Sequence, residues 1–179
     1  MMNLHFFIYI KHPERFSRAG FEAYCREFGL QATVPEDFSL TDPPVNNLFF
    51  VLIDDPDFTK GQEDGVCRLN IVVDPGAAVV SPRHKPLSIW DKLRKKRRVA
   101  FRAAIEDAKT VWRLCGSLYS PADGIPIFFL AGYLVRACGG IFETPGEDQF
   151  YLNSEELDPL VARILEQMRE MAQRGELKV

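Results

Sequence analysis

The stretch IPIFFLAGYLVRACGGIFET, residues 125–144, decides the fold that we expect. Its first part, Ile125 to Cys138, is apolar nearly all round and carries a single charge, Arg136, which predicts a helix buried on several sides. Gly139 and Gly140 follow, and glycine is the usual residue where a helix ends in the left-handed conformation. The last four residues of the stretch predict a strand that begins directly after the helix.

Apolar runs and alternation with a period of two predict further strands on either side of this stretch. These strands are Leu4 to Lys11, Leu30 to Val34, Leu48 to Ile53, Val66 to Val73 and Thr110 to Tyr119, with Ile141 to Thr144 and Gln149 to Leu152 as a hairpin. Apolar residues at helical spacing predict three more helices. They are Glu14 to Phe28, a segment from Ser88 or Asp91 to about Lys109, and a last helix that Asn153 and Glu156 begin as a capping-box-like pair.

The order of these elements predicts the fold class. Strands and helices mix without strict alternation, and short connections join several strand pairs, which favours α+β with a mostly antiparallel sheet covered by about four helices. The order β-α-β-β occurs twice, over residues 4–53 and 110–152. We therefore expect one domain over residues 1–179, built from two such units, with an internal seam at residues 75–90, where prolines and a glycine cluster.

The composition is that of an ordinary globular protein with an unusual distribution of charge. The chain has 179 residues, of which 46% are hydrophobic and 26% charged, and this excludes collagen-like, low-complexity and wholly disordered classes. Its formal net charge is only -3. Residues 83–113 nevertheless carry 11 Lys and Arg against three acids, a local net of +8, whereas the rest carries 11 against 22, a net of -11. A basic middle thus lies between acidic ends.

A run of basic residues in this middle segment is the strongest candidate interaction surface. We select five of its members as partner-binding residues: Lys92, Arg94, Lys95, Lys96 and Arg98. Such a helix can neutralise phosphates of a nucleic acid, bind an acidic protein partner or the acidic half of the chain itself, or simply form a solvated outer face. The run lies at the start of the predicted helix, where positive charge opposes the helix dipole. Because this placement is unfavourable for the helix, it indicates that the basic residues have a function.

An acidic run forms the second candidate surface. Its members are Asp54, Asp55, Asp57, Glu63 and Asp64. Carboxylates in a loop can bind a cation, but the EF-hand pattern fails here, because Lys60 stands where it requires glycine and Val66 where it requires glutamate. We therefore predict a solvated loop or a contact with a basic partner.

The cysteines and histidines predict neither a metal site nor a cofactor. The four cysteines lie far apart without a C-x-x-C pair, and no H-E-x-x-H or H-x-x-x-H motif exists, so the prediction is reduced thiols in a cytoplasmic protein. A Cys-His nucleophile pair stays open, because such partners need not be close in sequence. No run of 18 apolar residues exists, which argues against a membrane span.

The segment from Leu130 to Glu143, with Gln149, Phe150 and Tyr151 after the turn, resembles a pattern in small bacterial α+β proteins in which a helix ends in Gly-Gly and feeds a hairpin. Several such families are uncharacterised or are immunity proteins of polymorphic-toxin and type VI secretion systems. The resemblance covers about a tenth of the chain and brings no functional residues with it. It implies a protein that neutralises a cognate toxin by covering the active site of that toxin.

Three function classes follow from these observations. The first is a non-catalytic module that binds one protein partner. We favour this class because no catalytic motif rises above background. Its most specific form is an immunity protein that binds a toxin domain. The second is a nucleic-acid-associated protein that uses the basic segment 83–102, which predicts a steep salt dependence of binding. The third is an enzyme with an unrecognised site, for which a well-formed pocket with shifted pKa values is the expected sign.

Overall fold

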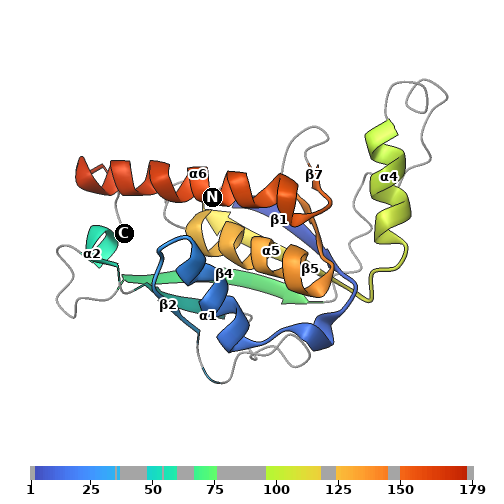
Figure 1. The fold of residues 1–179 in the computed structure, drawn as a ribbon, viewed down its shortest axis with the longest axis horizontal. Helices are drawn as coiled ribbons and strands as arrows, with labels where there is room; N and C mark the ends of the chain where they lie inside the picture. Colours follow the sequence, from blue (N-terminus) through green and yellow to red (C-terminus); the bar gives the residue numbers. More distant parts are fainter. Residues whose placement is uncertain are drawn as a thin grey trace.

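A computed structural model of the chain describes residues 3–34, 36, 48–53, 55–59, 67–75, 96–117, 124–144 and 150–176. Figure 1 shows helices packed against a twisted sheet. The strands are β1 (Asn3–Ile10), β2 (Ala32–Thr33), β3 (Leu48–Ile53), β4 (Cys67–Pro75), β5 (Thr110–Ser117), β6 (Ile141–Glu143) and β7 (Phe150–Tyr151). The helices are α1 (Arg18–Glu27), α2 (Pro56–Thr59), α4 (Lys96–Ile105), α5 (Gly124–Cys138) and α6 (Ser154–Gln173), with a 3-10 turn, η1, over Pro13–Arg15.

The sheet has seven strands in the order β2-β3-β4-β5-β1-β6-β7, and each recorded pairing is antiparallel. The predicted α+β class with an antiparallel sheet covered by helices is therefore confirmed. The two β-α-β-β successions do not form separate sub-sheets, however, because β1 lies between β5 and β6, away from β2 and β3. The apolar character of β1 explains its inner position in the sheet, because an inner strand has a neighbouring strand on each side and buries more of its surface.

The sheet separates a large core from a small one. On one face, Phe6, Ile8 and Ile10 of β1 alternate into the main core together with α1, α5 and α6. On the other face, Tyr9 of β1 packs with Phe101 of α4 and with two residues of the hairpin. The apolar helix α5 is buried along most of its length, as its sequence predicts, because it lies between the sheet and α6.

The predicted ends of two helices are confirmed in atomic detail. After α5, Gly139 has a φ of 62° and the Gly140 N–H donates to the Leu134 carbonyl at 2.9 Å. At the start of α6, Asn153 accepts the Glu156 N–H at 3.0 Å, while the Glu156 carboxylate accepts the Leu152 N–H at 3.1 Å. These bonds satisfy backbone groups that a helix leaves unpaired at its ends.

Two helix predictions differ from the structure. The helix expected over Glu14 to Phe28 is divided, because Ser17 adopts an extended conformation and caps a new helix by accepting the Gly20 N–H at 3.0 Å. The described part of the basic helix begins at Lys96 and ends at Ile105, four residues before the expected end. Most of the expected seam, residues 76–90, lies outside the described residues.

Replacing Gly140 by alanine should destabilise the fold by about 1–3 kcal/mol, because the added Cβ would lie 2.9 Å from the Leu134 carbonyl oxygen, a backbone atom that cannot easily move. Urea denaturation followed by circular dichroism measures this change. Gly124→Ala is the matched control at the other end of the same helix, since nothing lies within 4 Å of its added Cβ. Equal stabilities of the two variants would contradict the close approach at Gly140.

Candidate functional site

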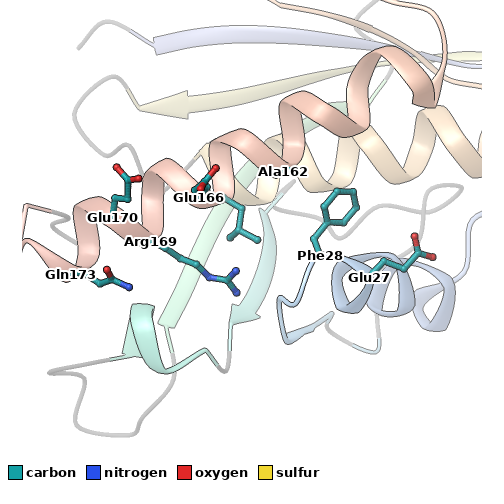
Figure 2. Close-up of a pocket in the computed structure, with 8 residues that line it drawn as sticks. Glu27, Phe28, Ala162, Glu166, Arg169, Glu170 and Gln173 are labelled. Carbon is teal, nitrogen blue, oxygen red and sulfur yellow. The ribbon is translucent and has the colours of Figure 1, made fainter.

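A hollow of about 510 Å³ lies between the end of α1 and the second half of α6. Figure 2 shows Arg169 reaching from α6 into this space, with Phe28 on the opposite side. The lining residues are Glu27, Phe28, Ala162, Leu165, Glu166, Arg169, Glu170 and Gln173. Its volume falls within the range of about 300–1,000 Å³ that is usual for ligand sites in proteins.

The amphipathic pattern of α6 determines which of its residues reach the hollow. Leu157, Val161 and Leu165 face the core, because they recur at a spacing of four residues. The residues of the last turns that lie beside this stripe then line the hollow from the α6 side. On the α1 side, Phe28 follows the last residue of the helix and packs against Phe129, with ring centroids 5.6 Å apart. An apolar floor with a polar rim results.

Arg169 joins three separate elements at one edge of the hollow. Its guanidinium donates to the Gly29 carbonyl at 2.6 Å and to the Asp55 carboxylate at 2.8 Å, and its Nε lies 3.7 Å from Asp57. The Asp55 side chain is only 7% exposed, and it also accepts the Asp57 N–H at 3.0 Å. A carboxylate this deeply buried needs a paired cation, because burial of an unpaired charge is costly. The link therefore ties α6 to α2 and to the turn after α1.

Arg136 binds Glu27, one of the residues that line the hollow. Its guanidinium also donates to Asp158 at 2.6 Å, and it lies 4.6 Å from the centre of the Tyr24 ring. The Tyr24 hydroxyl donates to the same Asp158 at 2.8 Å. Burial, and then the hydrogen bond to Asp158, raise the pKa of Tyr24 well above its ordinary value, so its proton stays in place. Arg136 of α5 thus binds Glu27, while Asp158 of α6 and the Tyr24 ring hold Arg136 in place.

The rim of the hollow carries more negative than positive charge. Three carboxylates line it, those of Glu27, Glu166 and Glu170, against the one guanidinium of Arg169, and Glu27 is itself paired with Arg136. Glu170 also pairs with Arg174 at 3.3 Å on the exposed surface. A site with an apolar floor and an acidic rim suits an amphipathic segment that presents lysine or arginine, because both parts of such a side chain find a complementary surface.

The structure brings together part of the predicted acidic surface. Asp55 and Asp57 both meet Arg169, whereas Asp54, Glu63 and Asp64 lie outside the described residues. The expectation of a solvated loop is wrong for Asp55, because Pro56–Thr59 forms a helical turn that packs near α6 and buries this carboxylate. Asp57, with a side chain 38% exposed, agrees better with that expectation.

The described part of the predicted basic surface lies at the other end of the molecule. Lys96 and Arg98 belong to the first turn of α4, and Figure 1 shows this helix at the opposite end of the long axis from α2. Lys92, Arg94 and Lys95 lie outside the described residues. Phe101 packs α4 against the sheet. Its ring stacks on that of Phe150, with ring centroids 4.6 Å apart, and meets that of Tyr9 edge-on, with centroids 5.5 Å apart.

Sequence reasoning missed the residues that build the hollow. Arg169 and Glu166 belong to no motif of the sequence, and Arg136 is the single charge of an apolar run. One signal was available, since a lone arginine in an otherwise apolar helix needs a charged partner. The identity of the partners, Glu27 and Asp158, depends on elements more than 20 residues away in either direction.

Known proteins provide no identification. No family model, no curated protein and no solved structure matches this chain. Within the described ranges, no group of three or more His, Cys, Asp or Glu side chains is placed to hold a metal ion. None of the helices searched in those same ranges has both the length and the apolar character that crossing a bilayer requires.

Proposed function

We propose that this chain is a non-catalytic module that binds one protein partner. The most specific form of this proposal is a cytoplasmic immunity protein that neutralises a cognate bacterial toxin. The observation that carries the proposal is the hollow beside α6, with its floor of Phe28, Ala162 and Leu165 and its rim of three carboxylates. Interfaces typically combine an apolar centre with a polar rim, and residues of both kinds line this hollow.

Fixed geometry supports the same proposal. Two residues that line the hollow are held before binding, because Arg169 binds Asp55 and the Gly29 carbonyl, and Glu27 binds Arg136. A preorganised site loses less conformational entropy when it binds, and this increases affinity. The negative rim also accelerates association with a basic partner, because complementary potentials steer the encounter.

The test is co-expression of the chain with the product of its neighbouring gene, followed by measurement of affinity in the purified pair. Reversing two rim charges, Glu166→Lys with Glu170→Lys, should reduce the association rate at least about tenfold at low salt, because attraction to a basic partner becomes repulsion. The matched control is Glu106→Lys with Asp107→Lys, two exposed acids after α4 at the other end of the molecule.

The outcomes separate the competing classes. Loss of binding in the α6 variant alone supports the hollow as the interface. A complex that both variants form equally well contradicts it. Recovery of nucleic acid alone, removable by nuclease and sensitive to substitutions through Lys92 to Arg98, would reject the immunity protein and favour the basic segment.

A further inference from the structure

Among the described side chains, Phe101 is the main attachment of α4 to the sheet. The helix packs on the face opposite to α1, α5 and α6, and Figure 1 shows it outside the layer that those three helices form. Of the α4 side chains that the structure describes, only that of Phe101 is buried, at 7% exposed. Ala100 and Ala103 are exposed, while Ala104 and Ile105 are partly exposed. Elements with so little buried apolar surface belong to the least stable parts of a fold.

Phe101 docks into a small core that is separate from the main one. Its ring stacks on Phe150 of β7 and meets Tyr9 of β1 edge-on, and Ile141 of β6 completes the buried part of this core. Among the described residues, the two cores have no buried residue in common. Departure of Phe101 therefore breaks up the small core and leaves the contacts of the main core in place.

A buried carboxylate on the same face lowers the cost of opening. Glu143 is 3% exposed, accepts the Tyr9 hydroxyl at 2.9 Å and lies opposite Phe150 in the ladder. Burial removes water from a charged group, and this is costly even where hydrogen bonds replace part of the solvation. Because Tyr9 and Phe150 both contact Phe101, departure of Phe101 gives water a path to Glu143. The solvation regained there offsets part of the apolar contact that opening loses.

The chain after α4 provides a place where the helix can turn away. Glu106 and Asp107 form an exposed turn, and the Lys109 N–H then donates to the Ile10 carbonyl at 2.9 Å. This bond fixes the chain to the end of β1 just before β5 begins at Thr110. Movement of α4 about residues 106–108 thus leaves the pairing of β5 with β1 in place.

Once undocked, α4 has little to keep it helical. It has ten residues, whereas isolated helices shorter than about 12–15 residues are marginal in water. Its sequence begins with Lys96, Arg97 and Arg98, and positive charge at the start of a helix opposes the helix dipole. Undocking and unfolding of α4 are therefore expected to occur together.

We propose that α4 is a detachable cover, which opens as one unit about residues 106–108 while the main core stays folded. The closed state hides the surface of Tyr9, Ile141 and Phe150 under Phe101, and the open state exposes it. Docking of one phenylalanine thus sets the access to this face of the sheet. The cover lies at the other end of the molecule from α2, and it does not rest on the function proposed for the hollow beside α6.

The experiment is hydrogen exchange of the full-length chain at pH 7, followed by mass spectrometry of peptides from α4 and from α5. We expect the α4 amides to exchange together, on the order of 100-fold faster than the α5 amides, because opening of α4 does not require unfolding of the main core. Phe101→Ala should accelerate exchange in α4 about tenfold further and change the α5 rates by less than about twofold. Ala103→Gln, on the exposed side of α4, is the matched control and should leave the α4 rates within about twofold.

A second variant tests the docking contact from the side of the sheet. Phe150→Ala removes the ring on which Phe101 stacks, so it should accelerate exchange in α4 about as much as Phe101→Ala does. The two substitutions remove the same contact, and the double variant should therefore exceed either single variant by less than about threefold.

Three results overturn the proposal: exchange in α4 as slow as in α5, acceleration by Phe101→Ala that is equal in α4 and α5, or α4 rates that Phe101→Ala leaves unchanged. The first two would mean that α4 and the main core open together, and the third that Phe101 does not hold the helix. The rates are measured without a partner, so failure of the interface proposed beside α6 leaves this result intact.

Discussion

Replacing Arg169 by methionine should lower the free energy of unfolding by about 3 kcal/mol, because the buried Asp55 carboxylate loses its cation. Methionine keeps much of the length and apolar stem of the side chain, so the change removes mainly charge and hydrogen bonds. The Gly29 carbonyl loses a donor at the same time, which loosens the turn after α1. Urea denaturation followed by circular dichroism measures the difference.

Two further variants make this prediction specific. Arg163→Met, an exposed arginine of the same helix, should change stability by less than about 0.5 kcal/mol, as surface substitutions usually do. Asp55→Asn in the Arg169→Met background should recover part of the loss, because the unpaired charge is gone. If Arg169→Met is as stable as Arg163→Met, the pair with Asp55 does not hold α2 against α6.

Replacing Phe142 by alanine should destabilise the protein by about 3–5 kcal/mol, the usual cost of emptying a phenylalanine site in a core. Phe142 is fully buried, and its ring stacks on Phe6 at 5.8 Å and meets Phe128 edge-on at 5.4 Å. The substitution therefore opens a cavity between β6, β1 and α5 that rigid neighbours cannot fill. Thermal and urea denaturation both report the effect.

Phe7→Ala is the matched control for this core, because Phe7 lies on the neighbouring strand, points to the opposite face of the sheet and is only half-buried. We expect a loss of about 1–2 kcal/mol there, in proportion to the smaller apolar area that the side chain buries. A larger loss at Phe7 than at Phe142 would mean that the face with α4, and not the face with α5, contains the main core.

Much of the fold could be predicted from the sequence because its signals are local. The apolar run of α5, the glycines after it and the alternation along β4 each depend on a few adjacent residues. The candidate hollow could not be predicted in this way. Glu27, Arg136, Asp158 and Arg169 come from three helices, and helical periodicity shows that their side chains are on outer faces but not which faces meet.

The pairing of the strands shows the same division. Apolar character and alternation indicate that β1 and β5 are strands, but pairing across 100 or more positions leaves no local trace. Only the register of β1 against β5 sets which residues lie opposite each other, and a slip of one residue would move each residue to the other face of the sheet.

The sequence by itself determined the secondary structure of most elements, the α+β class and the separation of positive from negative charge, since all three follow from the order and type of nearby residues. The tertiary structure alone decided that β1 is an inner strand beside β5 and β6, that Asp55 is buried against Arg169, and that Arg136 joins Glu27 to Asp158. The physical reason is that burial and ion pairing depend on which surfaces pack together, and that choice is made by the whole chain at once.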